Sequence, residues 1–280
     1  MIPGFFDLCI DLKYTSNENL RQILTTLYEM GYRNVAINQN LDESVLDTDK
    51  KKKKKTDDEA TKVAIVPLDL DKIKQEFKDK LFIMRRLTFG FSESTKTHIL
   101  EQQNLSKKFD IYSVLPKNQT ALQFACSQLS VDIITFDTSI KPLKFTRKLY
   151  LQAVERGIHF EIKYSDVISS QKRSNAFHYS HLFHIYGKSK NVFISSGAQE
   201  YSAIRNPYDI INLAALFGLN EVKAKAAILS QCKHLTNRAV GRRYGKCIFT
   251  IKVHGKHDEP DDKIKTEKSD TPTAKRIKLS

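Results

Sequence analysis

Residues 191–218 read NVFISSGAQEYSAIRNPYDIINLAALFG, and this stretch decides the fold class. It begins with a β-branched and aromatic run, NVFI, that is typical of a short buried strand. Asn206-Pro207 then predicts a helix N-cap followed by proline at the first helical position, with Asp209 in a capping-box-like place. The apolar pattern IINLAALF continues this helix, and Gly218 stands where it would end. The stretch is therefore one strand–loop–helix unit.

The same unit recurs along the chain. Six further apolar runs, each followed by a helical pattern, precede it: FFDLCIDL, NVAIN, LFIMRRLTFGF, FDIYSVLP, VDIITF and IHFEIKY. The runs are apolar on both sides, as parallel strands covered on both faces must be. This alternation, with its short connections, favours an α/β fold that is a (β/α) TIM-like barrel of about 7–8 parallel strands. No GxGxxG or GxxxxGK[ST] turn follows the first run, which disfavours a nucleotide-binding open sheet.

Two charged segments fall outside the repeating pattern. Residues 1–253 are expected to form a single barrel domain, interrupted by a low-complexity insert at 41–62 and followed by a disordered tail at 254–280. The insert holds seven basic and seven acidic residues, and the tail seven and six, so 13 of the 14 net positive charges belong to the folded part. Such a surplus favours a polyanionic partner, most simply nucleic acid, with solubility alone as the alternative.

Composition excludes several other classes of protein. No apolar run approaches the roughly 18 residues that span a bilayer, so no membrane association is expected. The start, MIPGFFDLCIDLK, lacks the features of a signal peptide. The four cysteines contain no CxxC pair, which fits buried thiols in a reducing compartment rather than disulfides or a zinc site.

The loop before Asn206 is a candidate functional segment. In a barrel, function collects at the carboxyl ends of the strands, and a loop that leads into a helix N-terminus is a favoured phosphate site. Arg205 stands immediately before the cap. Arg205 and Asn206 are therefore candidate RNA contacts, while the alternative is that Asn206 only caps the helix and Arg205 pairs with an acid. Lys163, which alternates with Glu161 at the end of the sixth strand, is a further candidate.

The segment NRAVGRRYGK forms a second basic cluster. Its candidate RNA-binding residues are Arg238, Arg242, Arg243 and Lys246, interleaved with Tyr244 and glycines. Arginine beside aromatic residues in a pliable segment suits backbone phosphates and unstacked bases. A solvated basic surface is the alternative interpretation.

The residues do not present a catalytic set. His178, His181 and His184 recur every three positions on a predicted helix, but they drift around it and have no acidic ligand nearby in sequence. Asp7 and Asp11 lie on one face of the first strand, and no GxSxG nucleophile motif occurs. A metal-dependent phosphoesterase that combines these acids, Glu161 and the helix histidines remains an alternative.

Several of these segments resemble a known family. FEIKYSDVI at 160–168, the ordered run from Asn191 to Cys232, MGYRNVAIN and RRLTF together resemble the thirty-kilodalton protein subunit of nuclear and archaeal ribonuclease P. In eukaryotes that subunit is shared with ribonuclease MRP. The resemblance runs from about Phe5 to Lys252 and excludes the insert and the tail. It implies a barrel similar to the polymerase-and-histidinol-phosphatase (PHP) phosphoesterases.

The resemblance also implies a role without catalysis. PHP phosphoesterases bind metal through D-L-H-x-H on the first strand, whereas this chain has Asp7-Leu8-Cys9-Ile10-Asp11 and lacks both histidines. The family's RNA subunit carries the chemistry and the magnesium, so no cofactor is expected on this chain. The implied partners are the catalytic RNA, precursor tRNA, a small α/β protein subunit and other ribonuclease P and MRP proteins. The implied function is support of 5′-leader removal from precursor tRNA, and of rRNA processing within ribonuclease MRP.

The tail suggests a location. PTAKRIKLS at 272–280 resembles a single-cluster nuclear import signal, with Lys275, Arg276 and Lys278 as its basic residues. We therefore expect the protein in the nucleus and specifically the nucleolus. A nuclear RNA-binding protein outside ribonuclease P is a third possibility.

Overall fold

The computed structural model describes residues 1–11, 17–45, 66–97 and 105–245. All of them fall within one compact unit, Met1–Ile248. The tail and most of the charged insert lie outside the described residues, so the predictions made for them are not addressed by the structure. No helix in the described ranges is long and apolar enough to cross a membrane.

Seven strands form one parallel sheet, with neighbours in sequential order. They are β1 Phe5–Asp11, β2 Tyr32–Asp42, β3 Phe82–Phe91, β4 Ile111–Pro116, β5 Ile133–Ile134, β6 His159–Lys163 and β7 Val192–Ser195. The sheet nearly closes, because a parallel bridge joins Ile10 on β1 to Ala198 just after β7, and the Asp11 amide donates to the Ala198 oxygen at 2.9 Å. The predicted (β/α) TIM-like barrel is confirmed.

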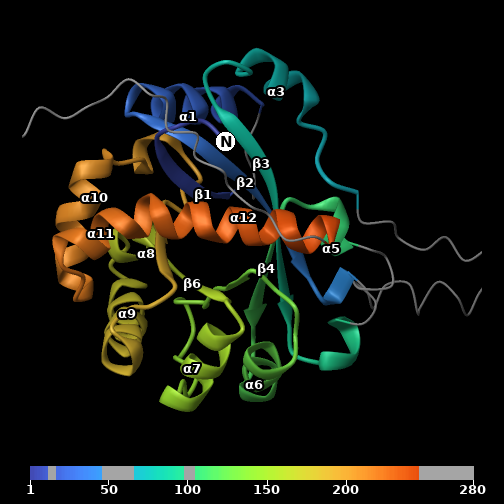
Figure 1. Cartoon of the computed structure of the whole chain (residues 1–280), viewed down its shortest axis with the longest axis vertical. Helices are drawn as coiled ribbons and strands as arrows, with labels where there is room; N and C mark the ends of the chain where they lie inside the picture. The colour runs from blue at the N-terminus through green and yellow to red at the C-terminus, as the bar shows by residue number, and fades with distance from the viewer. Residues whose placement is uncertain (12–16, 46–65, 98–104, 246–280) are drawn as a thin grey trace, which may run out of the picture. The chain divides into compact units, whose positions relative to one another are not determined.

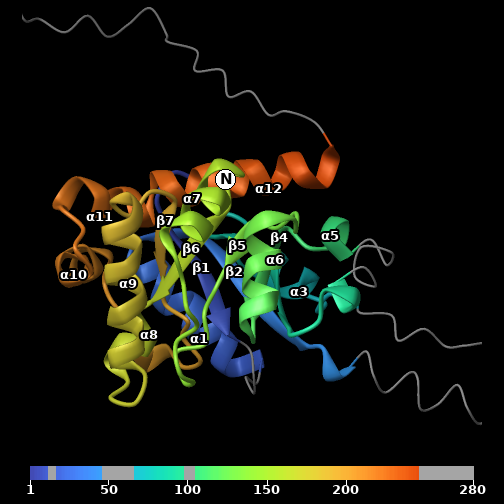
Figure 2. The same ribbon diagram turned by 90° about the horizontal axis from the view of Figure 1, so that it is seen from below.

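Helices follow the strands in alternation (Figures 1 and 2). They are α1 Asn17–Glu29, α3 Asp71–Glu76, α5 Leu105–Lys108, α6 Gln119–Ser127, α7 Arg147–Glu155, α8 Tyr164–Ile168, α9 Arg173–Gly187, α10 Pro207–Leu213, α11 Glu221–Ile228 and α12 Ser230–Tyr244. Helix α1 shows why these segments pack on the sheet. Its buried residues recur at spacings of three and four and form one apolar stripe: Leu20, Ile23, Leu24 and Leu27.

Helix α12 covers the amino ends of the strands. Its buried side chains Cys232, Leu235 and Ala239 pack in one cluster with inward-facing residues of the strands, including Phe6 and Ile111. In Figure 1 the helix, in orange, runs across the strands, and Figure 2 shows it along one edge of the barrel. The amino end is therefore closed by an apolar contact, and the carboxyl end is the open one.

The structure differs from the sequence-based expectation in two places. The fifth strand pairs only at Ile133–Ile134, although the apolar run VDIITF predicts six residues. Ser230–Tyr244 is a regular helix, α12, rather than the pliable segment that its basic cluster suggests. The glycine at position 241 is tolerated within that helix, since packing of its apolar stripe on the barrel outweighs the local propensity.

Candidate functional site

The interior of the barrel holds a buried ion pair between β3 and β6. Two guanidinium nitrogens of Arg86 each lie 2.6 Å from a carboxylate oxygen of Glu161, and both side chains are fully shielded from solvent. Arg86 Nη1 also donates to the backbone oxygen of Leu8 at 2.8 Å, which ties β1 to the pair. This bidentate geometry compensates both charges where the two side chains are shielded from bulk solvent.

Two serine hydroxyls extend this pair into a network. Ser195 Oγ on β7 donates to Glu161 Oε1 at 2.7 Å, and Arg86 Nη2 donates to Ser113 Oγ on β4 at 3.2 Å. Burial by itself would raise the pKa of Glu161, but the charge and hydrogen bonds of Arg86 lower it to about 2. Glu161 is therefore ionised at neutral pH and engaged with internal partners, which disfavours a role as proton acceptor or metal ligand.

Asp7 on β1 is a second buried carboxyl group. Its Oδ1 accepts hydrogen bonds from the amides of Cys9 at 3.3 Å and Ser196 at 3.0 Å, while Oδ2 has no partner among the described residues. Burial raises the pKa of Asp7 to about 6, although these hydrogen bonds act to lower it. Burial also raises the pKa of the Cys9 thiol to about 12, so Cys9 is the inert buried thiol that the cysteine pattern predicts.

A cleft of about 950 Å³ opens at the carboxyl ends of the strands, and we call it the carboxyl-end cleft. Its charged lining residues are Asp11, Asp42, Asp137, Asp166, Glu200, Lys117, Lys163 and Lys172. Lys117 pairs with Asp42 at 2.6 Å and Lys172 with Asp166 at 3.5 Å. Lys163 lines the cleft, as its position at the end of β6 predicts. Because carboxylates outnumber ammonium groups here, the cleft as a whole disfavours a polyanion.

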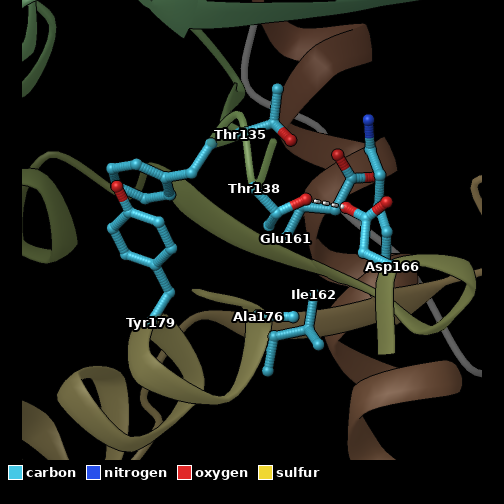
Figure 3. A pocket seen from close by; sticks show the side chains of 9 residues that line it. Thr135, Thr138, Glu161, Ile162, Asp166, Ala176 and Tyr179 are labelled. Atoms are coloured by element: carbon cyan, nitrogen blue, oxygen red, sulfur yellow. Dashed lines mark hydrogen bonds between the residues drawn. The ribbon is translucent and has the colours of Figure 1, made fainter. Parts of the chain in front are cut away.

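A smaller cavity of about 20 Å³ lies beside the carboxyl-end cleft and has room for about one water molecule. In Figure 3, Thr138 and Asp166 close one side of it through a hydrogen bond of 2.9 Å, and Tyr179 approaches from the opposite side. Glu161 also lines this cavity. The small volume leaves no space for a substrate next to the buried ion pair.

The structure does not assemble the alternative metal site. His178, His181 and His184 are exposed on α9, outside the barrel, where His181 Nε2 lies 3.2 Å from the backbone oxygen of Leu216. Glu161 is bound to Arg86 in the interior instead. Within the described ranges, no group of three or more His, Cys, Asp or Glu residues could hold a metal ion.

Two of the predicted RNA-binding arginines hold α12 against the barrel. Arg242 Nε lies 3.1 and 3.0 Å from the two carboxylate oxygens of Asp132, and its Nη2 lies 2.8 Å from one of them. Arg243 pairs with Asp110 and lies over the ring of Tyr244. Asp110 immediately precedes β4, and Asp132 immediately precedes β5. These two pairs therefore join α12 to the amino end of the sheet.

Arg238 has a similar structural role. Its guanidinium donates to the backbone oxygens of Val131 at 2.9 Å and Arg156 at 2.8 Å. Each of the three arginines therefore has internal partners and helps to hold the fold together, and RNA contact by this cluster stays a prediction. Lys246 lies outside the described residues, as do the import residues Lys275, Arg276 and Lys278.

Asn206 caps α10, as the sequence predicts. Its Oδ1 accepts from the amide of Tyr208 at 3.0 Å, and Pro207 occupies the first turn. Arg205 is exposed, and its Nη1 donates to the backbone oxygens of Ser202 at 2.7 Å and Ile204 at 2.9 Å. Arg205 thus hydrogen-bonds to its own loop and forms no ion pair with an acid in the described part of the chain.

The position of Arg205 differs from the expectation. Gly197, Glu200 and Ala203 line the carboxyl-end cleft, whereas Arg205 and Asn206 are not among its lining residues and lie near the amino ends of β1 and β2. There the Tyr32 hydroxyl donates to the Arg205 oxygen at 3.0 Å, and Tyr208 packs edge-on against Phe5. Arg205 and Asn206 therefore do not share a site with Lys163.

Sequence reasoning missed two features of this molecule. Arg86 stands in the middle of a buried strand, and a charged residue in such a run is a signal for an internal ion pair. The short turn GKSKN before β7 carries Lys188 and Lys190, and these lysines line a groove at the amino end. The sequence signal for this surface is the pair of lysines on either side of Ser189 in a short turn.

The fold and the interior define a class of protein, namely a (β/α) TIM-like barrel whose centre is closed by an ion pair. The model of the family RNase P subunit p30 matches residues 4–244, and the chain belongs to this family. The resemblance inferred from the sequence is confirmed.

Similarity to individual proteins agrees with this assignment. The mouse ribonuclease P protein subunit p30 is 30% identical over 266 residues, which are 93% of this chain and 95% of that protein. The Arabidopsis thaliana protein GAMETOPHYTE DEFECTIVE 1 is 35% identical over 161 residues, and the match spans 56% of this chain but only 28% of that longer protein. A chain in a cryo-EM structure of archaeal ribonuclease P with mature tRNA shares the fold, with a TM-score of 0.60, 15% identity, and coverage of 91% of this chain and 100% of that one.

Proposed function

We propose that the chain is a noncatalytic protein subunit of ribonuclease P, in which an RNA subunit removes 5′ leaders from precursor tRNA. Family membership across residues 4–244 is the observation that carries this proposal. The Arg86–Glu161 pair supports the noncatalytic part, because it occupies the barrel interior with groups that are already neutralised. In this proposal the RNA holds the magnesium ions and this chain holds no cofactor.

The proposed partners follow from the same family. They are the catalytic RNA, precursor tRNA, a small α/β protein subunit and the other ribonuclease P proteins, with shared use in ribonuclease MRP and rRNA processing. The net charge of +14 supports contact with RNA.

Affinity purification of the tagged full chain from cells tests the proposal. We expect co-purification of structured RNA and cleavage of precursor tRNA at the 5′ leader, and loss of that cleavage after nuclease digestion of the RNA. Phosphoesterase activity of the RNA-free chain that depends on Asp7 would contradict the proposal, and so would the absence of precursor-tRNA cleavage from the purified particle.

We also propose a nuclear, and specifically nucleolar, location that depends on the basic end of the tail. A fluorescent fusion of the full chain should accumulate in nucleoli. Combined substitution Lys275→Ala, Arg276→Ala and Lys278→Ala should shift it toward the cytoplasm, whereas Lys263→Ala with Lys265→Ala serves as a control within the same tail. Equal distribution of all three proteins would exclude the import role.

A further inference from the structure

A groove of about 330 Å³ lies at the amino end of the barrel, between the α9–β7 turn and helices α11 and α12. Three lysines line it: Lys188 and Lys190 on the turn, and Lys223 on α11. Gln231 from α12 forms another part of the lining. We call this feature the lysine groove. No carboxylate belongs to its lining, which distinguishes it from the carboxyl-end cleft.

The backbone of the turn fixes the positions of the first two lysines. Lys188, Ser189 and Asn191 have φ values of 51°, 57° and 56°, a conformation that residues with a side chain rarely adopt. The turn is held there because the Lys188 amide donates to the His184 oxygen at 2.8 Å and the Asn191 side chain donates to the Ile158 oxygen at 3.2 Å. The two ammonium groups therefore extend from a well-anchored turn.

The third lysine is positioned by the same turn. Lys223 Nζ donates to the backbone oxygen of Lys188 at 2.9 Å, which holds it at the groove. None of the three lysines forms an ion pair within the described part of the chain, in contrast to Lys117 at the other end of the barrel. Like charges that share a groove repel one another, and a bound polyanion relieves that repulsion.

The surroundings extend this positive surface. Helix α12 contains no acidic residue between Ser230 and Tyr244, and its exposed Lys233 and His234 lie two and three residues after Gln231. Asp132 and Asp110, the acids that α12 contacts, are already neutralised by Arg242 and Arg243. The groove lining and α12 therefore add positive charge without a carboxylate among their own residues.

We propose that the lysine groove binds the phosphodiester backbone of RNA. Lysine presents a compact point charge that suits phosphate oxygens without reading base edges, so this contact supplies affinity and orientation rather than sequence recognition. The inference rests on the proposed function, because it names the surface through which a ribonuclease P subunit meets its RNA.

The test compares two triple variants of the full chain with equal loss of charge. The groove variant is Lys188→Gln, Lys190→Gln and Lys223→Gln, and the control is Lys72→Gln, Lys78→Gln and Lys148→Gln, which are exposed lysines on other surfaces. Binding to the RNA that co-purifies with the wild-type chain is measured between 50 and 300 mM salt. We expect the groove variant to bind about 10- to 100-fold more weakly at about 0.1 M salt, with a log–log salt slope about 2 smaller in magnitude. The control should stay near the wild type, and thermal unfolding of all three should agree.

Two results would overturn the proposal while leaving the proposed function intact. One is a groove variant whose salt slope equals that of the wild type, in a particle that still cleaves precursor tRNA. The other is an unchanged salt slope together with loss of one protein subunit from the purified particle, which would assign the groove to an acidic protein surface. If the wild-type chain recovers neither RNA nor cleavage, the proposed function itself fails.

Discussion

The two ends of the barrel differ in charge and in what their charged side chains contact. At the carboxyl end, a cleft of about 950 Å³ is lined by five acidic residues and three lysines. At the amino end, a smaller groove of about 330 Å³ is lined by three lysines and no acid, next to a helix without acidic residues. The open end of the barrel is therefore the less suitable one for RNA.

This difference reverses the usual roles of the two ends of a (β/α) barrel. The end where barrels usually place their catalytic residues leads down to a bidentate ion pair, Arg86–Glu161, that ties β1, β3 and β6 together. Polar groups in that position stabilise the sheet instead of acting on a substrate. The opposite end, normally associated with stability, presents the positive surface.

The largest expected effect comes from breaking the interior pair. Glu161→Gln leaves the Arg86 guanidinium buried without a counter-ion, so the free energy of unfolding should fall by about 3–5 kcal/mol. Urea denaturation of the variant and the wild type measures this loss. The double variant Arg86→Met with Glu161→Leu removes both charges and should recover most of it. Equal losses for the single and double variants would show that the pair does not act as a unit.

The second effect is a pH dependence caused by Asp7. Its pKa is raised to about 6 in the folded protein, so the native state holds this proton more tightly than the unfolded chain. Stability is therefore lost as pH rises from about 4 to about 6, by about 3 kcal/mol in total. Glu161 has the opposite sign, because its lowered pKa makes stability fall as pH drops from about 4.5 to about 2.

Asp7→Asn separates these two contributions. Asparagine retains the oxygen that accepts from the Cys9 and Ser196 amides, but it does not titrate. In denaturant titrations, we expect the free energy of unfolding of the variant, relative to that of the wild type, to rise by about 3 kcal/mol between pH 4 and pH 7. The exposed substitution Asp79→Asn is the matched control and should run parallel to the wild type. A parallel course for Asp7→Asn as well would rule out the raised pKa.

The third effect concerns the attachment of α12 to the amino end. Arg242→Ala removes the main partner of the buried Asp132, so the free energy of unfolding should fall by about 2 kcal/mol. Lys233→Ala on the exposed face of the same helix should change it by less than about 0.5 kcal/mol. Thermal and urea unfolding provide both values. A loss of RNA affinity in Arg242→Ala without loss of stability would instead make Arg242 an RNA contact.

Local features of this site could be predicted from the sequence, and distant pairings could not. The Asn206–Pro207 cap and the shared face of Glu161 and Lys163 depend on spacings of a few residues, and the structure contains both. The pairing of Glu161 with Arg86 joins positions 75 residues apart, and that of Arg242 with Asp132 joins positions 110 apart. No local pattern specifies such partners, because they are chosen by the closing of the barrel.

The basic segment at 237–246 shows that local sequence patterns can also mislead. Its glycines and arginines are locally typical of a pliable basic segment, yet tertiary packing of Cys232, Leu235 and Ala239 makes it a helix. Once the helix lies across the amino end, its arginines meet carboxylates that the sequence places far away. Basic composition alone therefore does not distinguish an arginine that binds RNA from one that holds the fold together.

The smallest effect on stability is expected for Arg205, the exposed residue before the α10 cap. Its guanidinium donates to two backbone oxygens of its own loop and forms no ion pair in the described structure, so Arg205→Ala should lower the free energy of unfolding by less than about 0.5 kcal/mol. If its remaining N–H groups contact a phosphate, the same variant should bind the cognate RNA with a salt slope smaller by about 1 and slow precursor-tRNA cleavage. Arg242→Ala is the matched arginine control, with the reverse expectation of lost stability and a retained salt slope. A stability loss for Arg205→Ala as large as that of Arg242→Ala would make Arg205 a structural brace and leave the amino-end lysines as the RNA contact.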